Sequence, residues 1–93
     1  MYANVVEVEV DPSADPERKG LYEMVIPRVR QLPGVMSGQW MAPIGGKGLS
    51  VVTSQTEQAA RAALEDMGLK VGSSPAPGVT VLSIQTREVI GNL

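Results

Sequence analysis

Apolar and polar side chains alternate in the first stretch of the chain. From Asn4 to Val10 the order is Asn-Val-Val-Glu-Val-Glu-Val, and a period of two residues is typical of a β-strand with one buried face. The sequence therefore predicts a half-buried strand over residues 4–10. One face carries Val6, Val8 and Val10, and the other carries Val5, Glu7 and Glu9.

A helix is predicted next, with a proline inside it. Asp15 followed by Pro16 is typical of an N-cap with proline at the first helical position, where its missing N–H costs no hydrogen bond. Pro27 removes one backbone donor within the helix, so we expect a kink or a split near Ile26. The apolar positions recur at near-helical spacing, at Leu21, Val25, Val29 and Leu32.

Two strands joined by a glycine-rich turn follow. Residues 35–42 place Met36, Gly38 and Trp40 on one side, and residues 49–53 are rich in β-branched side chains. The intervening Gly-Gly-Lys-Gly at 45–48 would form an anion nest, but it lacks the spacing of a phosphate-binding loop and opens no helix. We therefore expect a β-hairpin turn there.

The second helix has signals at both ends. Ser54 and Glu57 match a capping box, in which both side chains satisfy backbone donors at a helix start. Gly68 followed by Leu69 is typical of a Schellman motif at a helix end. The apolar face between these signals consists of Ala60, Ala63, Leu64 and Met67.

The end of the chain predicts a short strand and a long one. Residues 69–71 are expected to form a short edge strand, residues 72–78 a loop, and residues 79–89 the last long strand. Alternation in the long strand places Leu82 and Ile84 on one face. The other face then carries Val79, Val81, Gln85, Arg87 and Val89.

The order strand-helix-strand-strand-helix-strand is typical of an α+β, ferredoxin-like βαββαβ fold, an antiparallel sheet with two helices on one face. Because the chain has 93 residues, we expect a single domain over 1–93. The uncovered face mixes apolar and polar residues and is too apolar for open solvent. We therefore expect a homodimer through this face, which carries Val5, Val79, Val81 and Val89 among Glu7, Glu9, Gln85 and Arg87.

Composition excludes several functional classes. A net charge of −2 argues against nucleic acid as a partner. No apolar run approaches the roughly 20 residues that span a bilayer, and no signal-peptide pattern is present, so we expect no membrane partner and a cytoplasmic location. The absence of Cys and His removes disulfides, the commonest metal ligands and ordinary catalytic triads. We expect no metal and no cofactor.

The chain resembles a known group of proteins. The element order, and the junction Leu32-Pro33-Gly34-Val35 leading into Ser37-Gly38-Gln39-Trp40, are similar to the dimeric α/β-barrel superfamily, including its antibiotic-biosynthesis monooxygenase-like and stress-responsive barrel families. The resemblance implies a homodimer whose sheets close a barrel, with a small-molecule pocket between each sheet and its helices or inside the barrel. Members include cofactor-independent oxygenases, haem-degrading enzymes and isomerases. Haem-degrading members ligate iron with a histidine, which this chain lacks, so that site is not carried over.

A polar cluster is the first candidate ligand site. If the first and last long strands are neighbours, Arg87 faces Glu7 or Glu9 across the strands, with Gln85 beside them. Such a cluster would hold an anionic ligand and supply a base. Alternatively it is a salt bridge in the dimer interface, which is the interpretation that we prefer.

An apolar cluster is the second candidate. Trp40 and Met36 would line a pocket for an aromatic molecule, although packing in a small core is the simpler interpretation. Other residues that would join them are Tyr2, Tyr22, Met24 and Met41.

The sequence favours a small homodimeric barrel protein of unassigned activity that binds a small apolar or aromatic molecule. One alternative is a cofactor-independent monooxygenase or isomerase acting on a polycyclic phenol, with Arg87 stabilising an anion and Glu7 or Glu9 moving a proton. Another is a structural or regulatory dimerisation module. Whether the protein is an enzyme is left open at this stage.

Overall fold

The computed structural model describes residues 1–93 and contains one four-stranded sheet. Its strands are β1 (Tyr2–Val10), β2 (Val35–Ile44), β3 (Lys47–Ser54) and β4 (Val79–Glu88). They lie in the order β2-β3-β1-β4, and every neighbouring pair is antiparallel. The predicted hairpin joins β2 to β3 through Gly45 and Gly46, which both have positive φ.

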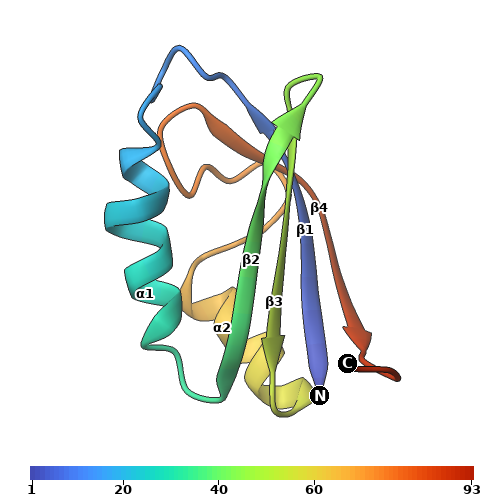
Figure 1. Cartoon of the computed structure of the whole chain (residues 1–93). Helices are drawn as coiled ribbons and strands as arrows, with labels where there is room; N and C mark the ends of the chain where they lie inside the picture. Colours follow the sequence, from blue (N-terminus) through green and yellow to red (C-terminus); the bar gives the residue numbers. More distant parts are fainter.

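The helices cover one face of this sheet (Figure 1). They are η1 (Gly20–Val25), which continues directly into α1 (Ile26–Arg30), and α2 (Glu57–Asp66). The amide Nδ2 of Asn4 on β1 donates a hydrogen bond to the carbonyl oxygen of Ala60 on α2 over 2.8 Å. The predicted α+β ferredoxin-like arrangement is therefore confirmed. No helix of the protein has the length and apolar character needed to cross a membrane.

Pro27 determines the winding of the first helix. Residues 20–25 form a π-helical turn in which the N–H of Ile26 donates to the carbonyl oxygen of Leu21, and α-helical winding begins at Ile26. In a regular α-helix the ring of Pro27 would clash with the carbonyl of Glu23, and the wider π turn relieves this clash. The winding thus changes at Ile26, where the sequence predicted a kink or a split, and the helix continues through this point.

The first helix begins later than Pro16, where the sequence predicted it. Asp15 does act as a cap, because its carboxylate oxygens accept hydrogen bonds from the N–H groups of Lys19 over 3.0 Å and Gly20 over 2.7 Å. Gly20 is buried against Ala76, and a Cβ at this position would lie 3.0 Å from the Ala76 Cβ. The missing side chain thus allows the start of the helix to pack tightly against the loop before β4.

The start of α2 also differs from the prediction. Thr56 is the N-cap, and its Oγ1 accepts a hydrogen bond from the N–H of Ala59 over 3.1 Å. The predicted capping box with Ser54 is wrong, because Ser54 is the last residue of β3, where it pairs with Tyr2 and is fully buried. Pairing with β1 therefore extends β3 through Ser54, the residue that the local sequence pattern assigned to the helix cap.

The end of α2 is as predicted. Gly68 has φ 64°, its N–H donates to the carbonyl of Glu65, and the N–H of Leu69 donates to the carbonyl of Leu64 over 2.9 Å. These are the two hydrogen bonds of a Schellman motif. The edge strand predicted at 69–71 is wrong, because that segment lies in a turn in which the N–H of Ser73 donates to the carbonyl of Lys70.

A β-bulge in β4 reverses the predicted orientation of its first half. Glu7 pairs with Ser83 but the next residue, Val8, pairs with Val81, so Leu82 is an extra residue on β4. Val81 therefore lies on the helix-covered face and is only 1% exposed.

The composition of the uncovered face changes accordingly. The assignment of Val81 and Val79 to that face is wrong, because strict alternation does not anticipate a bulge. Beyond the bulge, Gln85 pairs with Val5 and Arg87 pairs with Ala3, so both polar residues do lie on the uncovered face.

The core between the sheet and the first helix is thin. Only 11 of the 93 residues are buried, and the largest side chains that are fully buried are those of Val81 and Ser54. Leu21, Val25 and Ile26 on the first helix are half-buried. The helix therefore stands away from the sheet and leaves a space between them.

Candidate functional site

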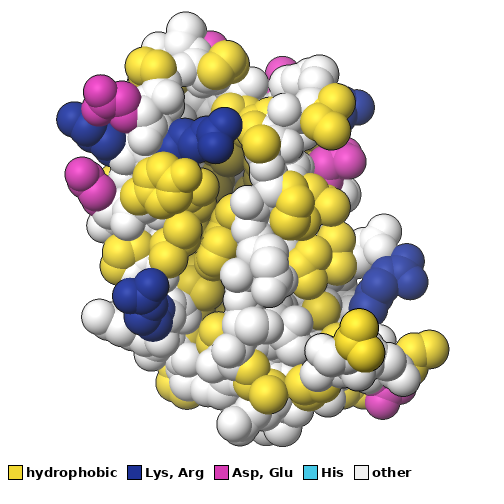
Figure 2. All heavy atoms as spheres, in the orientation of Figure 1, with side chains coloured by type: hydrophobic (Ala, Val, Ile, Leu, Met, Phe, Trp, Pro, Cys, Tyr) yellow, Lys and Arg dark blue, Asp and Glu magenta, His cyan; other side chains and the backbone are white.

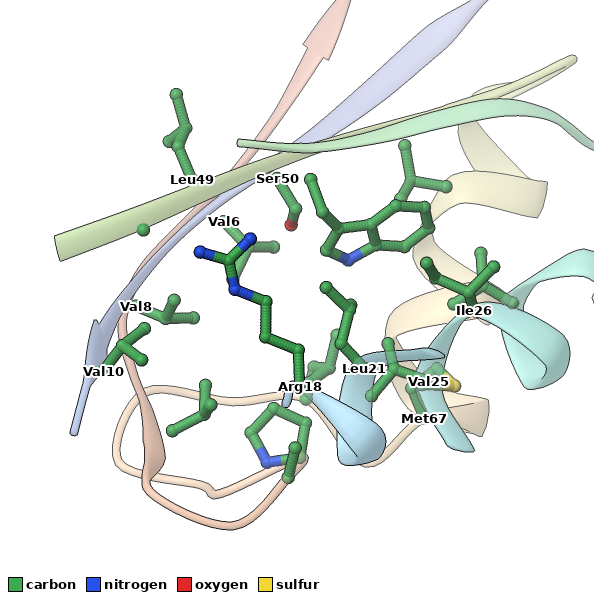
Figure 3. Close-up of a pocket in the computed structure, with 18 of the residues that line it drawn as sticks. Val6, Val8, Val10, Arg18, Leu21, Val25, Ile26, Leu49, Ser50 and Met67 are labelled. Atoms are coloured by element: carbon green, nitrogen blue, oxygen red, sulfur yellow. The ribbon is translucent and has the colours of Figure 1, made fainter. Parts of the chain in front are cut away.

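That space is a cavity of about 330 Å³ between the first helix and the sheet. Figure 2 shows it as a hollow lined by hydrophobic atoms beside the helix, and Figure 3 shows side chains from both walls pointing into it. Its volume and apolar lining are typical of small-molecule sites, which measure roughly 300–1,000 Å³. The sheet contributes Val6, Val8, Trp40, Ser50 and Val52, the first helix contributes Leu21, Tyr22, Val25, Ile26 and Val29, and α2 with the residues after it contributes Ala63, Leu64, Met67 and Leu69.

Gly38 makes room for the indole ring of Trp40 on the cavity wall. Both residues lie on the helix-covered face of β2, two positions apart, opposite Val52 and Ser50 of β3. A Cβ on Gly38 would lie 2.9 Å from Cη2 and Cζ3 of Trp40, well inside the optimal separation of about 3.5–4.0 Å between carbon atoms. The benzo edge of the ring therefore rests over the glycine, and the half-buried indole forms part of the wall.

Asn4 supplies a buried polar group at the α2 side of the cavity. Only 3% of Asn4 is exposed. Besides the hydrogen bond that its Nδ2 donates to Ala60, its Oδ1 accepts one from Thr86 Oγ1 over 2.8 Å. The side chain thus links β1, α2 and β4, which explains why an amide is tolerated in an apolar region.

Arg18 reaches over the cavity from the turn before η1 (Figure 3). It is the one non-glycine residue with positive φ, at 56°, a conformation that is unfavourable for side chains with a Cβ. Its N–H donates to the carbonyl of Asp15 and its carbonyl accepts from the N–H of Tyr22, both over 3.0 Å. The backbone is therefore held on both sides of this residue.

The carboxylates of Asp11 and Asp15 also line the cavity, and both accept hydrogen bonds from neighbouring groups. Asp15 caps the first helix as described above. Asp11 Oδ1 accepts hydrogen bonds from Ser13, over 2.6 Å from Oγ and 3.0 Å from the backbone N–H. Both bonds stabilise the ionised carboxylate and hold the pKa of Asp11 below its ordinary value. The bond from the Ser13 hydroxyl has the larger effect, and the bond from the backbone N–H has the smaller one.

The predicted polar cluster lies on the opposite face of the sheet from this cavity. Glu7 and Glu9 pair with Ser83 and Thr80, and neither forms an ion pair. Within the chain the predicted ion pair between Arg87 and a glutamate is wrong, because Arg87 Nε donates to Gln85 Oε1 over 2.7 Å; a salt bridge across a dimer interface stays a prediction. The register explains this result, because it places Arg87 opposite Ala3, four residues from Glu7 along β1.

The apolar candidates divide between the cavity and the surface. Trp40 lines the cavity together with Tyr22, whereas Met41 borders it from the next position on β2 and pairs with Leu49 on the uncovered face. Met36 does not, because it lies at a register shift between Val35 and Ser37 and is 53% exposed. Tyr2 and Met24 also lie outside the lining.

Sequence reasoning missed the polar residues of the cavity, among them Asn4, Arg18 and Ser50. Asn4 lies near the start of a valine-rich strand, on the same face as Val6 and Val8. A polar side chain on a face that is otherwise buried needs a hydrogen-bond partner, and this could have marked Asn4 as a candidate from the sequence. Arg18 resembles any surface arginine, and nothing in its sequence context indicates positive φ. The fold brings no group of three or more metal-ligating side chains together.

Two solved structures share this fold over the whole chain. One is a mutant of the haem degrader MhuD with two manganese protoporphyrin IX molecules bound per active site, at TM-score 0.66 and 19% identity, covering 100% of this chain and 98% of that one. The other is MhuD from Mycobacterium tuberculosis with two haems bound in its active site, at TM-score 0.66 and 20% identity, covering 100% and 99%. No protein-family model and no curated protein matches the sequence. The ferredoxin-like fold predicted from the sequence is therefore shared with these two structures.

Proposed function

We propose that the chain, acting as a single ferredoxin-like domain, binds a small, planar, largely apolar molecule in the cavity between the first helix and the sheet. The observation that carries this proposal is the cavity itself, about 330 Å³ in volume with 20 hydrophobic residues among the 29 that line it. The fold adds support, because the two similar haem-degrader structures hold porphyrins in their active sites.

The packing of the first helix supports the same proposal. Leu21, Val25 and Ile26 line the cavity and are only half-buried, so part of their apolar surface stays uncovered. Removing apolar surface from water stabilises by about 25 cal/mol per Å². A planar hydrocarbon between these residues and the sheet would supply the contacts that the empty cavity lacks.

The donor set of the cavity does not fit an iron porphyrin. Haem iron in proteins is held by His, by a Cys thiolate, by Met together with His, or by Tyr. This chain has no His and no Cys. The tyrosine at the cavity, Tyr22, is 57% exposed. We therefore assign the cavity to a metal-free aromatic molecule.

The catalytic alternative based on Glu7, Glu9 and Arg87 loses its support for this cavity. These side chains lie on the uncovered face of the sheet, so they contact no molecule held between the sheet and the first helix. We accordingly propose binding, without assigning a reaction.

Binding in the cavity can be tested with 2-naphthamide as a neutral planar probe. Val25→Phe projects a ring into the cavity, whereas Met24→Phe adds the same ring at a neighbouring position that is 59% exposed and outside the lining. We expect calorimetric binding to the wild type and to Met24→Phe, and none to Val25→Phe. The chain has one tryptophan, so its single indole N–H signal in NMR should shift on binding. Equal affinity for all three proteins, or no binding to the wild type, would contradict the proposal.

We also propose that the uncovered face of the sheet pairs with a second copy of the chain. Apolar residues of neighbouring strands adjoin there, with Val5 opposite Val51 and Leu49 opposite Met41. Leu49 is 39% exposed and Met41 is 42% exposed. Apolar side chains contiguous across three strands mark an interaction surface, and a homodimer would cover them.

Light scattering coupled to size-exclusion chromatography tests this pairing. Val51→Lys places a charge in the centre of the face and should convert the dimer to a monomer. Gln58→Lys makes the same change on the exposed surface of α2 and should leave the dimer intact. A wild-type protein that runs as a monomer at all concentrations would refute the pairing, and cavity binding is tested independently by 2-naphthamide.

A further inference from the structure

We infer that Arg18 recognises an acidic group on the molecule in the cavity, so that the ligand is a planar apolar acid, either a carboxylate or a phenolate. The inference rests on the proposed function, because it requires that the cavity binds a small molecule. It adds the chemical class of the ligand and its orientation.

The position of the guanidinium is the first argument. Figure 3 shows the side chain of Arg18 extending from the helix end across the cavity, toward the strands that carry Val6, Val8 and Ser50. In Figure 2 a basic side chain crosses the hollow near its upper end. A long cationic side chain that lies over apolar surface, with its stem along that surface, is ready to meet a ligand rather than bulk solvent alone.

The guanidinium also has no carboxylate partner in the protein. The two ion pairs of the chain are Lys19 with Glu17 and Arg61 with Glu57. Asp15, which lines the cavity, is occupied in capping the backbone N–H groups at the start of the first helix. Asp11, also at the cavity, accepts two hydrogen bonds from Ser13. The planar donor fork of Arg18 is therefore left for an external anion.

The backbone of Arg18 supplies the third argument. A residue with φ 56° and a full side chain is unfavourable, and it persists where surrounding structure fixes it. The hydrogen bonds to the carbonyl of Asp15 and from the N–H of Tyr22 fix it here. As a result the side chain leaves the turn in one direction, across the cavity. Strain of this kind is concentrated at binding and catalytic sites.

These positions define how the ligand would lie. Its acidic group would meet the guanidinium of Arg18 and the hydroxyl of Ser50, which points into the cavity in Figure 3. Its ring system would extend between Val25 and Ile26 of the first helix and toward Met67 beyond α2. A bidentate contact between guanidinium and carboxylate gives direction as well as affinity.

Three probes with the same naphthalene skeleton test the inference by calorimetry. They are 2-naphthoate, which carries a carboxylate, neutral 2-naphthamide, and 2-naphthylmethylammonium, which carries a cation. We expect the wild type to bind 2-naphthoate most tightly and the cation least. The preference for 2-naphthoate should weaken at higher salt, because the guanidinium is exposed enough to be screened.

Arg18→Gln isolates the role of the charge, and Arg30→Gln is the matched control on the exposed surface of α1. Arg18→Gln should reduce the affinity for 2-naphthoate by about tenfold, the effect of one hydrogen bond to a charged group. It should reduce the affinity for 2-naphthamide by a smaller factor, because a neutral acceptor gains less from the guanidinium, and Arg30→Gln should change neither affinity. Arg18→Lys, which keeps the charge but loses the fork, should fall between the wild type and Arg18→Gln.

The possible failures are distinguishable. If 2-naphthamide binds but Arg18→Gln leaves 2-naphthoate affinity unchanged, or if the cationic probe binds best, the role of Arg18 is refuted and the cavity function stands. If none of the three probes binds the wild type, the proposed function fails and this inference fails with it. A thermal melt of each variant confirms that it is folded before binding is measured.

Discussion

Removing the side chain of Asn4 should destabilise the protein, because that side chain links three elements around the cavity. Asn4→Ala removes the hydrogen bond that Nδ2 donates to the carbonyl of Ala60 and the one that Oδ1 accepts from Thr86, each 2.8 Å long. A typical intramolecular hydrogen bond contributes about 0.5–1.5 kcal/mol net. The free energy of unfolding should therefore fall by about 1–3 kcal/mol, which corresponds to a decrease in Tm of roughly 5–20 °C for a domain of this size.

Chemical denaturation at one fixed protein concentration measures this loss, and the chain provides its own control. Asn92, the other asparagine, is exposed in the C-terminal tail, and Asn92→Ala should change stability by less than about 0.5 kcal/mol. Thr86→Val removes one of the two bonds with little change of shape and should cost about 1 kcal/mol.

A double-mutant cycle then separates the shared bond from other effects. Because Asn4 and Thr86 share one hydrogen bond, the double variant should lose less stability than the sum of the two single variants. Strictly additive losses, or an Asn4→Ala protein as stable as the wild type, would refute the role given to this network.

Three further predictions concern single positions. Gly38→Ala should displace the ring of Trp40, because the new Cβ would lie 2.9 Å from two ring carbons, and the fluorescence emission of the single tryptophan should shift; an unchanged spectrum would contradict the packing. Gly68→Ala should destabilise the protein by about 1–2 kcal/mol in denaturant melts, because alanine is unfavourable at the φ of 64° that residue 68 adopts. No atom lies within 4 Å of the added Cβ, so this cost comes from the backbone alone. Ser13→Ala should raise the pKa of Asp11, whose lowering begins with the Ser13 hydroxyl, and carboxyl ¹³C NMR titration would show it. Because the folded pKa is lowered, the contribution of Asp11 to stability is present above its unfolded pKa and is lost as the pH falls through the folded value.

Local signals in the sequence predicted most of the fold. Gly45 and Gly46 predicted the hairpin, Gly68 with Leu69 predicted the end of α2, and Pro27 predicted an irregularity near Ile26, where the winding of the first helix changes. Each of these features depends on the backbone preferences of one or two residues, so no distant contact was needed to anticipate it.

Features set by distant contacts were not predictable in the same way. Ser54 fits a helix cap locally, but pairing with Tyr2 holds it in β3. Trp40 lies on the same face of β2 as Gly38, as alternation predicted, because the pairing of β2 is regular from Ser37 to Met41. The position of Arg18 over the cavity depends on the turn at Asp15 and on its own positive φ, and neither follows from residue type.

The extra residue Leu82 allows the two halves of β4 to keep different phases. Val81 and Ile84 both meet residues of β1 on the helix-covered face, Val8 and Val6 respectively, although three positions separate them. Deleting Leu82 would leave these pairings in a regular ladder, with Ile84 still covered and Arg87 still on the uncovered face. Deleting a residue between Ile84 and Arg87 would instead move Arg87 to the helix-covered face. The strand should therefore accept the loss of a residue at the bulge more easily than elsewhere along its length.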